Sequence, residues 1–103
     1  MEKQEALEAL KTGHTIWGVD YAQQVCETFG VSFPQSLIQV YESDRNPMGV
    51  TMLHGPEDGV YSLDLACHIA TCLGVADRAV GFIGRGSQAR EYARVVAEKL
   101  GIG

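Results

Sequence analysis

Apolar residues recur at steps of three and four in several segments, which is the spacing of one helix face. We expect helices over residues 2–12, 20–29, 63–73 and 87–100. A glycine follows each of them, at positions 13, 30, 74 and 101, and glycine is the residue that most often ends a helix. Ser62 is the expected N-cap of the third helix, because a serine oxygen can accept from a first-turn N–H group.

Three of these segments end in the same pattern, an aliphatic or aromatic residue, a glycine and a second aliphatic residue. The three copies are Phe29-Gly30-Val31, Leu73-Gly74-Val75 and Leu100-Gly101-Ile102. The pattern predicts a glycine in the left-handed conformation, followed by a residue that folds back onto the last turn.

The remaining apolar runs are short and favour strands. Residues 79–83 read as a short buried strand, and residues 50–54 as another. Residues 55–59 have the composition of a tight turn, so Val60 and Tyr61 are expected to pair back on 50–54 as a hairpin. Residues 34–43 suit either a helix or a strand, and Trp17 is expected in a short link.

These elements predict an α/β or α+β fold, with a small sheet covered by four to five helices. The sheet would consist of the hairpin plus a short strand within residues 79–84. The chain has 103 residues, 46 % of them apolar, which fits a single globular domain over residues 1–103.

Charge is unevenly distributed along the chain. The net charge is −5, which argues against nonspecific binding to nucleic acid or to an anionic membrane. Residues 1–66 carry a net charge of −7, whereas residues 67–103 carry +2, with every base of that second part after Gly74. A local basic region in an acidic protein indicates a specific anionic ligand.

The three cysteines, Cys26, Cys67 and Cys72, are an odd number without regular spacing, which is a poor disulfide framework. The charged start of the chain lacks the apolar core of a signal peptide, and no apolar run approaches the length of a membrane span. We therefore expect a soluble, cytoplasmic protein.

The sharpest motif is the run Gly84-Arg85-Gly86-Ser87-Gln88-Ala89, between the strand expected at 79–83 and the last helix. Over about 20 residues this region is similar to the dinucleotide-binding fingerprint of Rossmann-type dehydrogenases. The resemblance implies a phosphate held by the first N–H groups of the helix. That family also uses an acidic residue on a following strand, and the chain ends at Gly103, so we expect an anion site and not a complete dinucleotide site.

The expected ligand is therefore a phosphate-bearing, nucleotide-like small molecule bound within residues 84–90. Its predicted contacts are Gly84, Arg85, Gly86, Ser87, Gln88 and Arg90. Arg90 has no acid three or four residues away, whereas Arg94 can pair with Glu98 on the same helix. Arg85 and Arg90 are thus the more informative arginines.

A different interpretation is a DNA-binding helix-turn-helix over residues 69–80, with an earlier copy over residues 25–40. The spacing of Ala70, Gly74 and Val80 is similar to that of response-regulator effector domains. The first version requires a recognition helix through Gly81 and Gly84, and the negative net charge also disfavours it.

Catalytic and metal-binding patterns are sparse. His68 and Cys72 are four residues apart and could face one site, but buried thiols and a partly exposed histidine are the simpler reading. The sequence shows no nucleophile elbow or phosphate-binding lysine loop, and His54 with Asp58 is better explained by turn chemistry. We expect no enzymatic activity, metal or cofactor.

A third possibility is an acidic protein-interaction module of inhibitor or immunity type, without a ligand. The first half of the chain is rich in aromatic residues, namely Trp17, Tyr21, Phe29, Phe33 and Tyr41. Core packing explains them, but they also suggest self-association, and we expect a homo-oligomer.

Overall fold

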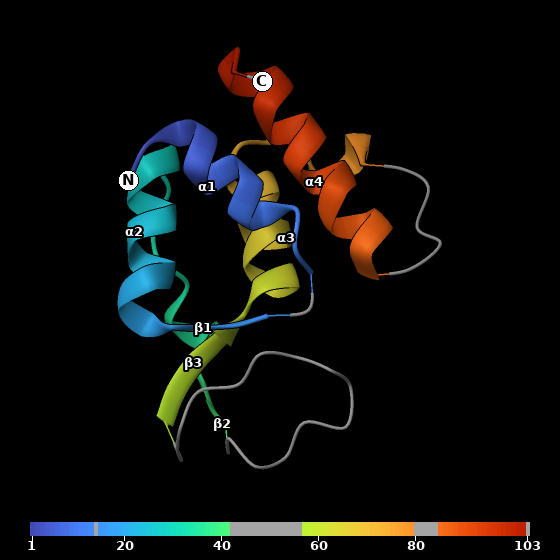
Figure 1. The fold of residues 1–103 in the computed structure, drawn as a ribbon. Helices are drawn as coiled ribbons and strands as arrows, with labels where there is room; N and C mark the ends of the chain where they lie inside the picture. The colour runs from blue at the N-terminus through green and yellow to red at the C-terminus, as the bar shows by residue number, and fades with distance from the viewer. Residues whose placement is uncertain (14, 42–56, 80–84, 103) are drawn as a thin grey trace.

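The computed structural model describes residues 1–13, 15–41, 57–79 and 85–102, which form an α+β fold. In these residues three short strands form an antiparallel sheet in the order β1-β3-β2. The strands are β1 (Ile16–Gly18), β2 (Gln39–Tyr41) and β3 (Glu57–Tyr61). Figure 1 shows the sheet at one end of the molecule and the C terminus at the other.

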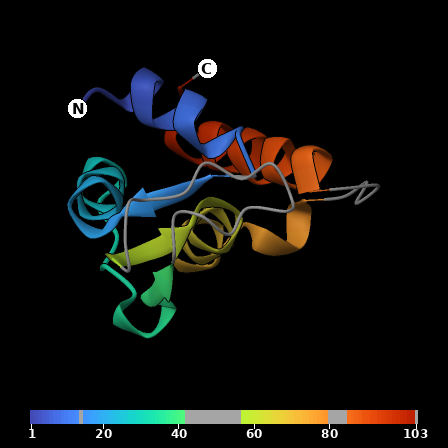
Figure 2. The same ribbon diagram turned by 60° about the horizontal axis from the view of Figure 1, so that its bottom comes forward.

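Four helices pack on one another, and the second and third of them also pack on this sheet. They are α1 (Lys3–Leu10), α2 (Val19–Phe29), α3 (Ser62–Cys72) and α4 (Arg85–Leu100). Helix α3 is central, because it contacts the other three helices and β3. Helix α1 lies against α4, so the first and last helices of the chain are neighbours (Figure 2).

The core is built from the apolar faces of these helices. Ala6, Leu7 and Leu10 are the buried face that the sequence predicts for α1. Leu65 and Ile69 of α3 are fully buried at the centre of the same cluster. The predicted helices 2–12, 20–29, 63–73 and 87–100 are therefore confirmed, with every end within two residues of its expected position.

The shared helix ending has the predicted geometry in all three copies. Gly30, Gly74 and Gly101 have φ of 72°, 76° and 70°, in the left-handed region. The N–H of the following residue donates to the carbonyl five residues back, at 3.0 Å for Val31, 2.9 Å for Val75 and 3.0 Å for Ile102. This is the Schellman arrangement, in which the aliphatic residue after the glycine returns to the core. Gly13 also has a positive φ, of 130°, but α1 ends before it, at Leu10.

The sheet differs from the sequence prediction. Glu57, Asp58 and Gly59 belong to β3 and not to a turn, and Val60 pairs with Trp17 of β1. Trp17 is therefore in a strand and not in a link. The hairpin partner predicted at 50–54 lies outside the described residues, as do residues 80–84 of the predicted strand, whereas Ala79 has extended backbone.

The ambiguous segment 34–43 contains both kinds of structure. A 3-10 turn, η1 (Gln35–Leu37), is followed by β2, which pairs with β3 through Gln39 opposite Gly59. The segment that suited either a helix or a strand is thus a short 3-10 turn followed by a short strand.

Ser62 is buried but does not cap α3, because Tyr61 occupies the N-cap position and Ser62 is the first helical residue. Its Oγ accepts a hydrogen bond from the N–H of Thr15 at 3.2 Å, and its own N–H donates to the Thr15 carbonyl at 2.8 Å. This reciprocal pair extends the β1–β3 pairing by one step into α3. Ser62, the expected cap, therefore links the first residue of α3 to Thr15 instead.

Most of the described aromatic side chains of the first half serve the core. Trp17 and Phe29 are buried, and Phe33 packs partly against the same cluster. Tyr21 is exposed and meets Trp17 in a T-shaped contact with ring centroids 5.2 Å apart. Core packing thus accounts for Trp17, Phe29 and Phe33.

Candidate anion-binding site

The predicted phosphate-binding segment is largely the first turn of α4. The helix begins at Arg85, two residues earlier than expected, so Gly86 and Ser87 are helical residues and not part of a loop before the helix. Gly84 lies outside the described residues. In a helix that begins at Arg85, the N–H groups of the first three helical residues have no acceptor within the helix. The free main-chain donors are therefore those of residues 85–87, and the N–H of Gln88 belongs to the helix itself.

The side chains at the start of α4 have different surroundings. Ser87 and Gln88 are half-buried, and Gln88 Nε2 donates to the Tyr92 hydroxyl oxygen at 3.4 Å. Gln88 therefore acts within the helix rather than facing outward as a donor. Arg90, one turn into the helix, is exposed.

Arg90 lines a groove between α1 and α4 with a volume of about 400 Å³. One wall consists of Gln4, Leu7 and Glu8 from α1 and of Lys11 directly after it. The other consists of residues from α4 and just after it, namely Arg90, Ala93, Arg94, Ala97, Glu98 and Ile102. This volume is within the range of small-molecule sites. None of the α1 residues was predicted for the site, because nothing in the sequence indicates that the first helix packs beside the last.

Two of the three cations in the groove are already paired. Lys11 Nζ lies 3.1 Å from Glu8 Oε1, and Arg94 Nη1 lies 2.6 Å from Glu98 Oε2. In the described part of the chain, Arg90 makes no ion pair or hydrogen bond. The groove therefore presents one uncompensated guanidinium beside an apolar floor.

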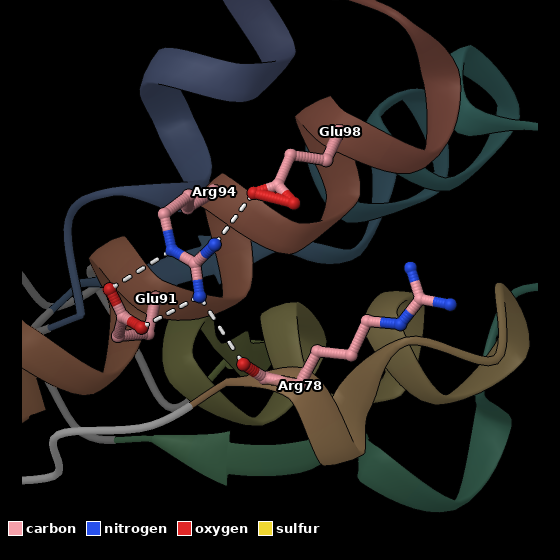
Figure 3. Close-up of polar contacts among 4 residues, drawn as sticks. All are labelled: Arg78, Glu91, Arg94 and Glu98. Atoms are coloured by element: carbon pink, nitrogen blue, oxygen red, sulfur yellow. Dashed lines mark hydrogen bonds and ion pairs between the residues drawn. The ribbon is translucent and has the colours of Figure 1, made fainter.

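Arg94 is hydrogen-bonded both to side chains of its own helix and to a residue that lies earlier in the chain than α4. Its Nε and Nη2 donate to the two carboxylate oxygens of Glu91 at 3.3 and 3.1 Å, and Nη2 also donates to the Arg78 carbonyl oxygen at 3.2 Å. Arg78 ends the 3-10 turn η2 (Ala76–Arg78). Figure 3 shows the guanidinium of Arg94 between Glu91, Glu98 and this carbonyl, with the Arg78 side chain pointing away.

The hydrogen bonds of Arg94 hold neighbouring parts of the protein in place and do not indicate a ligand-binding role. Its hydrogen bonds to Glu91 are the main cause that raises the pKa of Arg94 above its ordinary value, with the charges of Glu91 and Glu98 adding to them. Because Nε, Nη1 and Nη2 each donate to a carboxylate or a carbonyl, Arg94 holds η2 against α4. The predicted Arg94–Glu98 pair is confirmed, and Arg90, unlike Arg94, has no partner among the described residues.

Comparison of the chain with protein-family models, with curated proteins and with solved structures gave no match. None of the helices in the described residues has the length and apolar character needed to cross a bilayer.

The helix-turn-helix interpretation does not fit the backbone after α3. Residues 76–78 form only the 3-10 turn η2, and Ala79 has φ −78° and ψ 124°, which is extended. A recognition helix that starts near Asp77 is therefore interrupted at Ala79. In the earlier copy, the expected reading helix with Gln35 and Gln39 is a 3-10 turn followed by a strand.

The described residues contain no cluster of three or more side chains suited to a metal ion. His68 and Cys72 do face each other, as their spacing suggested, with Cys72 Sγ 3.4 Å from His68 Nε2. His14 and His54 lie outside the described residues, whereas Asp58 is in β3.

Proposed function

We propose that this chain is a small, non-enzymatic ligand-binding or regulatory protein that holds a phosphate-bearing small molecule beside Arg90. The observation that carries the proposal is the unpaired Arg90 guanidinium in the groove between α1 and α4. A phosphate there would accept charge-assisted hydrogen bonds from a group that has no other partner in the described residues.

The composition of the groove favours an anion that also has an apolar part. Leu7, Ala93, Ala97 and Ile102 supply apolar surface, while the carboxylates of Glu8 and Glu98 are compensated by Lys11 and Arg94. A base or another flat ring can cover the apolar surface while the phosphate meets Arg90. The start of α4 adds the positive end of its dipole along the same helix.

The test is calorimetry of the full chain against a panel of nucleotides and inorganic phosphate at fixed ionic strength. Arg90→Ala should weaken a ligand that binds the wild type by about 1.5–3 kcal/mol, the usual contribution of a hydrogen bond to a charged group. This corresponds to a factor of roughly 10 to 150 in Kd. The fold should be unaffected, because Arg90 is exposed.

Lys99→Ala is the matched control. Lys99 is an exposed cation on the same helix, and the groove lining does not include it. Removing it changes the net charge as much as Arg90→Ala does, so it measures the general electrostatic effect. Equal losses in the two variants would refute the proposed site, and so would an absence of binding to every member of the panel.

An absence of binding would favour the third possibility, an interaction module without a ligand. Native mass spectrometry of protein purified from cells distinguishes these outcomes, because it reports the bound small molecule and the number of chains together. We propose that the protein forms a homo-oligomer. Native mass spectrometry should then show the retained ligand on an assembly of more than one chain.

A further inference from the structure

The groove between α1 and α4 contains a second cation that a ligand can recruit. Lys11 follows α1 directly and lines the groove together with Arg90. The two helices pack together and run in opposite directions (Figure 1 and Figure 2), so the end of α1 lies beside the first half of α4. Lys11 and Arg90 are therefore at the same end of the groove, whereas Gln4 and Ile102 belong to the other end.

The ion pair that holds Lys11 is a weak one. Lys11 Nζ lies 3.1 Å from Glu8 Oε1, and the two side chains are 42 % and 67 % exposed. Exposed ion pairs contribute little to stability, because water solvates each partner when they separate. A phosphate carries more charge than a carboxylate at neutral pH and offers more acceptor oxygens. It can therefore take Lys11 from Glu8, whose carboxylate then faces water.

The third cation of the groove is held more firmly. Arg94 donates to both carboxylate oxygens of Glu91, at 3.3 and 3.1 Å, and to Glu98 Oε2 at 2.6 Å. It also donates to the Arg78 carbonyl oxygen at 3.2 Å. A ligand does not need to break these contacts, so Glu98 stays neutralised and Glu8 is the carboxylate of the groove that loses its partner.

The rest of the groove suits the organic part of an elongated ligand. Leu7, Ala93 and Ala97 supply apolar surface beside the two cations. Arg90 and Ala97 are about 10 Å apart along the axis of α4, which leaves room for a ring system beyond the phosphates. Gln4 adds an amide at the far end, and an amide both donates and accepts hydrogen bonds, as the edge of a nucleobase does.

We propose that the ligand of this groove is a nucleoside diphosphate, with one phosphate on Arg90 and the other on Lys11, which Glu8 releases on binding. This inference rests on the function proposed above and adds the number of phosphates that the site recognises. A monophosphate meets one of the two cations, whereas a diphosphate meets both. The second charge-assisted contact, less the small loss of the Lys11–Glu8 pair, should make the diphosphate bind about five- to thirtyfold more tightly.

The experiment is calorimetry of the full chain with the monophosphates and diphosphates of adenosine, guanosine and uridine, and with inorganic pyrophosphate, at fixed ionic strength. Lys11→Ala should remove most of the preference for the diphosphate and change the Kd of the monophosphate by less than about twofold. Lys3→Ala is the matched control, because Lys3 is an exposed lysine of α1 that does not line the groove. It should leave the preference unchanged.

Glu8→Gln should act in the opposite direction. Glutamine removes the anion that competes for Lys11, so the diphosphate should bind about two- to fivefold more tightly than it binds the wild type. If the Lys11–Glu8 pair only stabilised the end of α1, both variants would weaken binding or leave it unchanged. The opposite signs therefore separate a binding role of Lys11 from a structural one, and circular dichroism checks that both variants fold.

The outcomes distinguish this inference from the proposed function beneath it. If monophosphates and diphosphates bind equally and Arg90→Ala weakens both, the inference is overturned while the proposed function stands. A preference for diphosphates that survives Lys11→Ala also overturns it. Pyrophosphate that binds as tightly as the diphosphates would exclude a role for the nucleoside, and so overturn the ligand class. If no nucleotide binds, the inference and the proposed function are both wrong.

Discussion

Replacing Gly74 by alanine isolates the energy of the left-handed helix ending. A Cβ on Gly74 would meet no atom within 4 Å, so the substitution introduces no clash, but φ is +76°. The left-handed conformation costs an alanine about 1–2 kcal/mol. Alanine also restricts the unfolded chain, which returns about 0.4–1 kcal/mol. The expected net loss is about 1 kcal/mol.

Gly18→Ala is the matched reference for this substitution. A Cβ there also meets nothing within 4 Å, but Gly18 has φ −62°, which alanine adopts without strain. The entropic gain of about 0.4–1 kcal/mol remains, but Gly18 is also the N-cap of α2, where alanine is less favourable than glycine, so this variant should change the free energy of unfolding little. The difference between the two variants is then the left-handed cost at Gly74 less the smaller N-cap cost at Gly18, about 1 kcal/mol.

Urea unfolding measures both free energies through the fluorescence of Trp17, the single tryptophan, which is buried in the fold. Gly74→Ala should lower the midpoint, whereas Gly18→Ala should leave it nearly unchanged, with equal slopes. If the two variants had equal free energies of unfolding, the positive φ of Gly74 would not be the reason that glycine is needed there, and the prediction would be wrong.

Three further predictions concern particular contacts. Ser62→Ala should cost about 1–3 kcal/mol in urea unfolding, because the Thr15 N–H loses its acceptor, whereas Thr71→Ala, which removes an exposed hydroxyl, should cost less than about 0.5 kcal/mol. Arg94→Lys should speed hydrogen exchange at the backbone amides of η2, because a lysine ammonium cannot bond to Glu91 and to the Arg78 carbonyl in the way that the guanidinium does. Unchanged exchange would show that the bond to this carbonyl does not hold η2. The unfolded Cys26 thiol ionises near its ordinary pKa of 9.0 but the folded one near 11, so stability should fall as pH rises from about 9 to 11, at most about 1.4 kcal/mol per unit. Cys26→Ala should remove that part of the pH dependence.

The helices could be predicted from sequence because their signals are local. The buried face of α1 lies within eight residues, and the ending at Gly30 depends on a hydrogen bond that spans five. A repeated pattern of this length is sufficient to specify a left-handed glycine and the residue that returns after it. Its recurrence at Gly74 and Gly101 confirms that the pattern encodes backbone geometry.

The sheet could not be predicted in the same way, because its partners are distant in the chain. Gly55-Pro56-Glu57-Asp58-Gly59 has turn composition, yet its last three residues are in β3. Strand pairing of Asp58 with Val40, and of Gly59 with Gly18 more than forty residues away, outweighs local preference there. Ser62 shows the same effect, since its acceptor role depends on Thr15 and not on its own helix.

The candidate site combines both kinds of information. The absence of an acid three or four residues from Arg90 is a local feature, and it correctly anticipates a guanidinium without a partner on its own helix. The groove beside it depends on α1, which the chain contributes from its other end. A ligand in that groove would contact both helices, so its binding free energy would add to the packing of α1 on α4. The arginine of the candidate site could therefore be identified from the sequence, whereas the residues of α1 that line the same groove could be identified only from the structure.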